Sequence, residues 1–299
     1  MVADATALVL GATGMLGQAL MAYARSHGMR ALGAARQGTD LSFDLLDGAS
    51  VAAVVKTVRP ALVINAAAMT DLAACEADPK RAFAVNAGAV GVLAEVCGEV
   101  TARLIHISTD HFFVGDGDKL HVETAPVHIV NEYARSKLAG ETLALASPAA
   151  LVVRTNVTGF RGWTGRPTFA EWMFESIMSN AETVLFDDFI CSTIDARALA
   201  KAIFRLDEAN ATGLLNVAAR QPASKKKFVE EVAKILGRPL TRCKTGSVAS
   251  LVPRRAESLA LDVGAAECKL GYRLPSVTDV ACSLVEEYRN RCDTVTPFR

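Results

Sequence analysis

The sequence lacks three features that would point to particular classes of protein. Its 299 residues carry 32 acidic and 32 basic side chains, and neither sign forms a long run, so no nucleic-acid or membrane-surface partner is expected. No stretch approaches the ~20 consecutive apolar residues that span a bilayer. The first ten residues also lack a basic segment followed by a long apolar core. These absences favour a cytoplasmic protein whose partner is a small molecule.

The seven cysteines include no CxxC pair. An odd number of unpaired cysteines, in a chain without an export signal, argues against both a disulfide framework and a zinc site. A reducing compartment is therefore expected, and no metal is predicted from these residues.

Short apolar runs alternate with longer alanine-rich segments of helical period. This alternation is typical of βαβ units and predicts a Rossmann-type α/β fold, a doubly wound parallel sheet with helices on both faces. A smaller, interleaved C-terminal substrate domain is expected where the alternation falters. The predicted strands are 7–10, 62–64, 104–107, 151–153 and 214–217, and the predicted helices are 15–26, 50–58, 79–99 and 132–145. The predicted dinucleotide-binding domain comprises residues 1–158 and 194–219. The predicted substrate-binding domain comprises residues 159–193 and 220–299.

A glycine-rich segment, Gly11-Ala-Thr-Gly14-Met-Leu-Gly17, directly follows the first predicted strand and opens the first predicted helix. Glycines there permit a tight turn and a close backbone approach, and the N–H groups of a new helix favour a pyrophosphate. This context favours dinucleotide binding over a purely structural turn. The expected contacts are Gly11, Thr13, Gly14, Met15 and Leu16.

The second strand is expected to end near Arg36, where NAD-specific proteins usually carry an acidic residue for the adenosine ribose. A guanidinium suits a 2′-phosphate, so NADP(H) is the preferred cofactor and NAD(H) remains possible; a solvated surface arginine is the alternative. Asp44 is placed to accept a hydrogen bond from the adenine amino group, with Leu45 beside it.

Tyr133 and Lys137 share one face of a predicted helix because they are four residues apart. A nearby ammonium favours phenolate, so the tyrosine pKa is expected to fall below ~10 and the pair could exchange protons with a carbonyl or alcohol. Thr109 follows a predicted strand and would offer a hydroxyl at the carboxyl edge of the sheet. By contrast, His106 is expected to be a satisfied core histidine, and Lys225-Lys-Lys227 a solvated face.

These motifs together resemble the extended short-chain dehydrogenase/reductases, and most closely their dTDP-4-dehydrorhamnose reductase-like group of sugar-nucleotide enzymes. The likeness covers nearly the whole chain. The matching stretches are Gly11–Gly17, Val63–Ala68 with Thr70 and Cys75-Glu76, Val85–Ala87, Ile107–Asp110, Tyr133–Glu141, Val153–Thr155, Asn216–Ala218, Ser224–Phe228 and Pro253–Arg255.

The resemblance implies reduction of a 4-keto sugar nucleotide by NAD(P)H. Its catalytic residues would be Thr109, Tyr133 and Lys137, and the last two would also contact the cofactor. The small side chains of Ala66, Ala67 and Ala68 would line the cofactor, and the resemblance also allows a homodimer through the helix of Tyr133.

The resemblance further implies which residues line the sugar pocket: Met69, Asp110, His111 and Asn156. The chain departs from the family in two informative places. Ala19 stands where magnesium-binding members carry glutamate, so no metal is expected. His111 replaces a common tyrosine, which leaves the identity of the sugar open.

Two other functions stay open at this point. One is an NADP-binding regulatory subunit, although the retained catalytic set favours an enzyme. The other is a sugar-nucleotide epimerase or dehydratase on the same scaffold. A dehydratase needs two acid-base groups, and its usual glutamate after Ser-Thr-Asp is missing here, where His111 follows Asp110.

Overall fold

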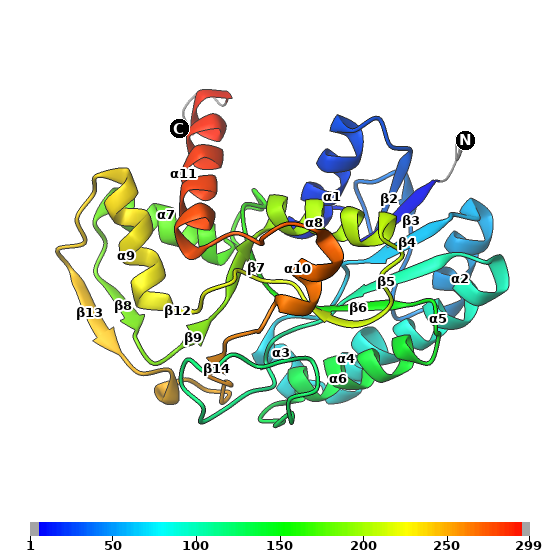
Figure 1. The fold of residues 1–299 in the computed structure, drawn as a ribbon, viewed down its shortest axis with the longest axis horizontal. Coiled ribbons are helices and arrows are strands. Elements are labelled where there is room, and N and C mark those ends of the chain that lie inside the picture. Colours follow the sequence, from blue (N-terminus) through cyan, green and yellow to red (C-terminus); the bar gives the residue numbers. More distant parts are fainter. Residues whose placement is uncertain (1–5, 295–299) are drawn as a thin grey trace.

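The structure, a computed structural model, describes residues 6–294, so the first five and last five residues of the predicted domains lie outside the described residues. Within that range, seven parallel strands form the main sheet (Figure 1). Their spatial order is β11 (Gly213–Asn216), β6 (Leu151–Arg154), β5 (Arg103–Ile107), β4 (Leu62–Asn65), β1 (Ala7–Leu10), β2 (Ala31–Ala35) and β3 (Leu41–Ser42). The chain order reverses between β1 and β4, which confirms the predicted doubly wound sheet and marks the point where such sheets bind ligands.

Alternate residues of β1 supply two separate cores, because successive side chains of a strand point to opposite faces. Val9 packs with the helices α1 (Met15–Ser26) and α8 (Ala196–Glu208). Leu8 and Leu10 pack with α2 (Gly48–Val58) and α5 (Ala89–Val100) on the other face. The catalytic helix predicted at 132–145 is α6 (Glu132–Leu145), and the Asn131 side chain caps its first turn by accepting from the Ala134 N–H.

The predicted helix 79–99 is continuous but not uniform. It consists of α4 (Pro79–Phe83), a π-helical turn η1 (Ala84–Gly88) and α5, and it follows the short helix α3 (Leu72–Ala77). By length and composition alone the stretch Pro79–Val100 could cross a membrane. In the structure this stretch packs between α2 and α6, and most of the buried residues of α5 belong to the core on the α2 side of the sheet.

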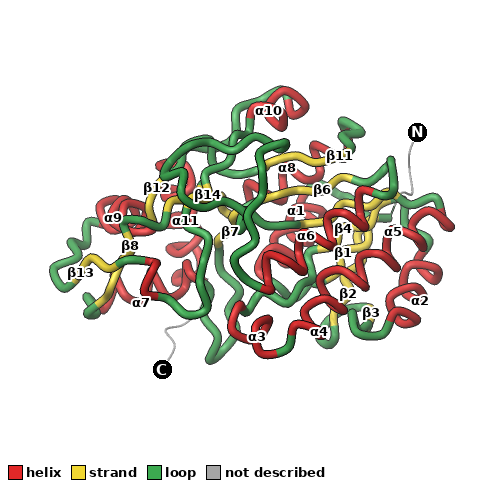
Figure 2. Tube along the Cα trace, turned by 90° about the horizontal axis from the view of Figure 1, so that it is seen from below, coloured by secondary structure: helices red, strands yellow, loops and turns green. Residues whose placement is uncertain are grey.

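A second, smaller core lies at one end of the molecule, opposite α2 and α5 (Figure 2). It joins α7 (Phe169–Ser179), α9 (Lys225–Leu236) and α11 (Val277–Thr294) with the parallel pair β8 (Thr183–Phe186) and β13 (Cys243–Gly246). Beside it lie a three-stranded sheet and one short helical turn. These elements are β12 (Ala223–Ser224), β9 (Ile190–Cys191), β14 (Ser258–Leu259) and η2 (Val248–Ser250), and α10 (Gly264–Leu270) follows them in the sequence.

The two parts are interleaved along the chain. β7 (Asn156–Thr158) and β10 (Thr193–Asp195) pair in parallel, and they carry the chain out of the large sheet and back to α8. α10 lies late in the sequence but packs on α8 and β11, so the C-terminal segment also contributes to the first core. The exact domain boundaries remain a prediction.

Candidate active site

The glycine-rich turn closes tightly between β1, α1 and β4. Gly11 has a φ of +81°, in the left-handed region that favours glycine. A Cβ on Gly11 would lie 2.9 Å from the Ala67 nitrogen, and a Cβ on Gly17 would lie 2.1 Å from the Gly11 carbonyl oxygen. Side chains at these two positions would therefore push α1 or β4 away from the turn.

The start of α1 fits an anionic ligand. Its N-cap residue, Gly14, provides no capping side chain, and its first turn contains no acidic residue. Uncapped N–H groups at a helix N-terminus favour phosphate. Met15 and Leu16 would contribute through their backbone, since the Leu16 side chain is buried in the core. The predicted contact Thr13 lies beside the loop after β2, where a Cβ on Gly38 would be 3.8 Å from the Thr13 Cγ2.

The residues predicted for the adenosine end lie at the surface beyond β2 and β3. Arg36 is exposed directly after β2. Asp44 is also exposed, and its Oδ1 accepts from the Leu46 N–H at 3.0 Å, while Leu45 packs partly against the core. Asp40, which was not predicted to belong to this region, also lies near β2, where its Oδ2 accepts from the Gly33 N–H at 3.4 Å.

The segment after β4 is held in a fixed path beside the glycine turn. The Ala66 N–H donates to the Leu10 carbonyl at 3.0 Å, and Ala67 contacts Gly11. Met69 is anchored by Asn86 in η1, whose Oδ1 accepts from the Met69 N–H at 2.8 Å and whose Nδ2 donates to the Met69 carbonyl at 3.0 Å. The predicted cofactor lining 66–68 and the predicted substrate residue Met69 therefore follow one another along the carboxyl edge of the sheet.

Tyr133, Lys137 and Thr109 converge at the carboxyl end of β5. All three are at least 92% buried, with exposed fractions of 8%, 2% and 4%. The Thr109 side chain hydrogen-bonds the Tyr133 hydroxyl. The Lys137 ammonium donates to the Ile107 carbonyl at 2.7 Å and lies 3.4 Å from the His106 Nε2. The structure thus brings the predicted catalytic residues together.

Burial dominates the proton affinities of this group. It raises the pKa of Tyr133 to about 12, and the hydrogen bond with Thr109 opposes that rise. It lowers the pKa of Lys137 to about 8, against the attraction of Glu141. The predicted fall in the tyrosine pKa is therefore wrong for this structure, because loss of solvent around the phenolate outweighs the hydrogen bond with Thr109.

Two buried networks fix the catalytic helix to the sheet. His106 is fully buried, with its Nδ1 3.1 Å from the Asn65 Nδ2 and its Nε2 3.4 Å from the Lys137 ammonium, so it lies in the core as predicted. Glu141, one turn after Lys137, accepts two hydrogen bonds from Arg154 at 2.9 and 2.7 Å and one from Ser108 at 2.5 Å. The buried ion pair between Glu141 and Arg154, with the Ser108 hydrogen bond, therefore holds α6 against β6 and the end of β5.

The predicted sugar-pocket residues lie next to Thr109. The Asn156 Nδ2 donates to the Asp110 Oδ2 at 2.7 Å. Burial raises the pKa of Asp110 to about 7, whereas Asn156 and Lys225 lower it. His111 packs edge-on against Tyr133 and Phe189, with ring centroids 5.6 and 6.4 Å apart, and its buried Nδ1 has no partner in the described part of the chain.

Lys225 also reaches this site, so the predicted solvated face is wrong for that lysine. Its ammonium lies 3.4 Å from the Asn156 Oδ1 and 3.3 Å from the Thr193 Oγ1, and 4.4 Å from the centre of the Phe169 ring. Arg255 approaches from another C-terminal segment, and burial lowers the pKa of His111 to about 4 with help from Arg255 and Lys225. The single sequence signal for Lys225 is its place directly after the N-cap Ser224 of α9.

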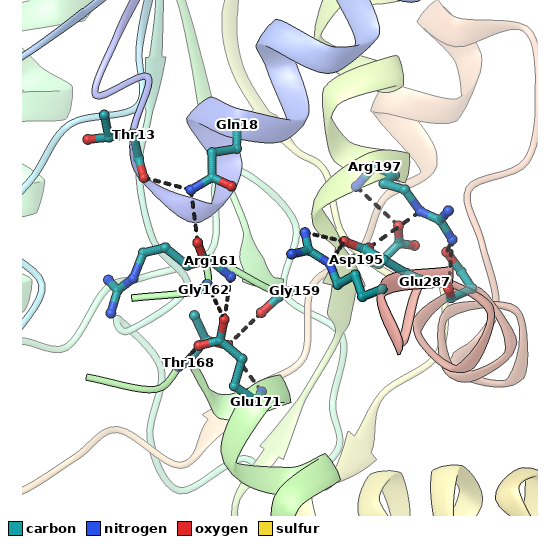
Figure 3. Close-up of polar contacts among 12 residues, drawn as sticks. Thr13, Gln18, Gly159, Arg161, Gly162, Thr168, Glu171, Asp195, Arg197 and Glu287 are labelled. Carbon is teal, nitrogen blue, oxygen red and sulfur yellow. Dashed lines mark hydrogen bonds and ion pairs between the residues drawn. The ribbon is translucent and has the colours of Figure 1, made fainter. Parts of the chain in front are cut away.

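A loop that leads into the smaller core lies against the glycine turn (Figure 3). The Gln18 Nε2 on α1 donates to the Thr13 carbonyl at 2.9 Å and to the Arg161 carbonyl at 3.0 Å. Glu171 in turn accepts from the Arg161 and Thr168 N–H groups at 2.6 and 2.7 Å, which completes the cap of α7. On the same side, Arg197 contacts Ser283 and Glu287, so α8 is tied to α11. These contacts join the predicted cofactor turn to the smaller core.

Between residues 6 and 294, no group of three or more His, Cys, Asp or Glu side chains is arranged to hold a metal ion. The seven cysteines are free thiols. The absence of a metal remains a prediction.

Comparisons with known proteins place this geometry in a family. A family model described as the RmlD substrate binding domain matches residues 5–289. The chain belongs to this family. It is 31% identical over 292 residues to the "Probable low-salt glycan biosynthesis reductase Agl14" of Haloferax volcanii, covering 93% of this chain and 96% of that protein. It is 36% identical over 221 residues to a dTDP-4-dehydrorhamnose reductase of Mycobacterium tuberculosis, covering 72% of this chain and 69% of that one.

The family fold is also seen in solved structures. A dTDP-4-dehydrorhamnose reductase from Bacillus anthracis, solved in complex with NADP, matches with a TM-score of 0.84 and 22% sequence identity. The match covers 95% of this chain and 99% of that one. This likeness supports the extended Rossmann architecture of the RmlD family member described here.

Proposed function

We propose that this protein is a reductase that uses NADPH, or less readily NADH, to convert the 4-keto group of a deoxysugar nucleotide into an alcohol. The observation that carries the proposal is the convergence of Thr109, Tyr133 and Lys137 at the same carboxyl edge of the sheet as the glycine turn. The relatives named as reductases of dTDP-linked 4-keto sugars support the same chemistry.

The residues of the chain account for the proton half of the reaction. When bound, reduced nicotinamide would be the source of the hydride for the carbonyl carbon. Tyr133 donates its phenolic proton to the carbonyl oxygen, and Thr109 holds that oxygen by a hydrogen bond. Lys137 has a third N–H donor besides those used by Ile107 and His106, and this donor would hold the nicotinamide ribose. A positive charge on Lys137 would also favour the phenolate that remains.

The same geometry supports the predicted cofactor and substrate sites. The glycine turn and the uncapped start of α1 would hold the pyrophosphate, and Arg36 would contact a 2′-phosphate. Asp44 and Leu45 would lie by the adenine, and 66–68 along the nicotinamide half. Met69, Asp110, His111 and Asn156 would line the sugar pocket. A homodimer and a cytoplasmic location remain part of the proposal.

A substrate panel tests this function. The purified protein is mixed with NADPH and 4-keto-6-deoxy or parent hexose nucleotides, and absorbance at the reduced-nicotinamide band is followed. We expect stoichiometric NADPH oxidation with a keto sugar and none with its parent. Loss of water from a parent sugar without net NADPH oxidation would instead indicate a dehydratase, and cofactor binding without turnover of any substrate would favour a regulatory subunit.

A further inference from the structure

A chain of side-chain contacts leads from the substrate-binding part to the catalytic hydroxyl. It begins at Lys225, the first residue of α9, and passes through Asn156 on β7 to Asp110 after β5. The Asp110 Oδ1 lies 3.5 Å from the Thr109 Oγ1, and Thr109 hydrogen-bonds Tyr133. Lys225 begins α9, a helix of the smaller core, whereas Tyr133 lies on α6 against the large sheet, so the contacts connect these two parts of the molecule.

The geometry of Lys225 fixes its ammonium in one place. The cation lies over the Phe169 ring and 5.9 Å from the Phe189 ring, and its hydrogen bonds go to the neutral oxygens of Asn156 and Thr193. The Thr193 hydroxyl also donates to the Asn156 Oδ1 at 2.9 Å. With two donors on its oxygen, the Asn156 amide must direct its nitrogen at Asp110, which fixes the direction of the whole chain of contacts.

We propose that Lys225 is a positioning residue of the reductase site, which acts through Asn156 to control the charge on the Asp110 carboxyl beside the catalytic hydroxyl. Through these contacts, α9 of the smaller core influences how readily Tyr133 gives up its proton. The predicted change in the reduction rate rests on the proposed function. The predicted effect of Lys225 on the pKa of the Asp110 carboxyl does not.

The charge on Asp110 matters because of where it lies. The groups that face this carboxyl are Tyr133 on α6, Cys191 on β9, Lys225 on α9 and, next in the chain, His111. A negative Asp110 raises the pKa of Tyr133 and makes it a weaker proton donor. Since the Asp110 pKa is about 7, reduction should slow as the pH rises through neutrality. Removing Lys225 would move this transition to higher pH, because a positive charge lowers a carboxyl pKa.

Two readouts and a matched control test the proposal. The first is the single-turnover rate of NADPH oxidation by stopped flow between pH 5.5 and 9, with the keto sugar that the panel identifies. The second is the carbon-13 shift of the Asp110 carboxyl in protein labelled at aspartate, assigned with Asp110→Asn. Lys225→Met and Asn156→Ala remove the contacts in two independent ways, and Lys225→Arg keeps the charge. Lys227→Met removes an exposed lysine from the same helical turn.

In both readouts, Lys225→Met and Asn156→Ala should raise the transition by roughly 0.5–1 pH unit, the size expected for one charge or hydrogen bond at a shielded site. Lys225→Arg and Lys227→Met should leave it near the parent value. An unchanged transition in Lys225→Met, or an equal shift in Lys227→Met, would overturn the proposal. If no sugar nucleotide is reduced, the proposed function fails, and the carboxyl titration still decides whether Lys225 controls Asp110.

Discussion

Replacing Gly17 by alanine should abolish tight cofactor binding without unfolding the protein. The added Cβ would lie 2.1 Å from the Gly11 carbonyl oxygen, whereas real Cβ contacts are essentially never shorter than 3.0 Å. The start of α1 must therefore move by about 1 Å from the turn, since the backbone oxygen cannot rotate away. A shift of that size stretches N–H···O bonds of ~2.9 Å beyond hydrogen-bonding distance.

The cost can be worked from the bonds at stake. Each hydrogen bond to a charged group contributes about 1.5–3 kcal/mol. Losing two of them at the pyrophosphate costs roughly 3–6 kcal/mol, which corresponds to a Kd increase of about 10²- to 10⁴-fold. Fluorescence titration with NADPH would measure this change, with circular dichroism as a check on folding.

Gly98→Ala is the matched control for this substitution. Gly98 lies inside α5, and a Cβ there would meet nothing within 4 Å. The control should bind NADPH like the parent and gain about 0.5–1 kcal/mol of stability, because alanine is the better helix former. A folded Gly17→Ala protein that binds NADPH within about threefold of the parent would refute the assignment of this turn to the cofactor.

Three further predictions follow from the same site. NADPH should bind at least about tenfold more tightly than NADH, and Arg36→Ala should remove that preference in a fluorescence titration; equal affinities in the parent would exclude Arg36 from the site. Tyr133→Phe should keep NADPH binding but lower kcat by about 10²- to 10⁴-fold, whereas Lys137→Met should lose both turnover and affinity; parental turnover by Tyr133→Phe would disprove the mechanism. Arg154→Met should lower the free energy of unfolding in urea by about 3–5 kcal/mol, because it leaves Glu141 buried and unpaired, and a loss below about 1 kcal/mol would contradict the buried-pair argument.

The fold and the grouping of the proposed catalytic residues could be predicted because their signals are local. The glycines around Gly11 stand next to each other in the sequence, and Tyr133 and Lys137 share a helix face through their spacing alone. β3 has only two residues and carries no comparable signal, so it was not predicted. The π-helical turn η1 was also missed, since nothing local distinguishes it from the helix around it.

Interactions between distant segments were not predictable in the same way. Lys225 stands in a run of three lysines, a pattern that predicts a solvent-exposed helix face. Its hydrogen-bond partner Asn156 lies 69 residues away in the sequence, so the pattern around Lys225 does not reveal the contact. The pKa of Tyr133 likewise depends on how completely the surrounding segments exclude water. Such properties are set by tertiary packing, and the sequence pattern around each residue does not contain them.

The most direct test of the central claim is to follow the transferred hydrogen. The protein is incubated with a 4-keto-6-deoxy sugar nucleotide and NADPH deuterated at the reactive nicotinamide carbon, and the sugar product is examined by mass spectrometry and NMR. A hydride-transferring reductase should place one deuterium on C4 of the product for each NADPH oxidised. A product without deuterium at C4, or sugar conversion with no NADPH consumed, would contradict the assignment of this site as a reductase.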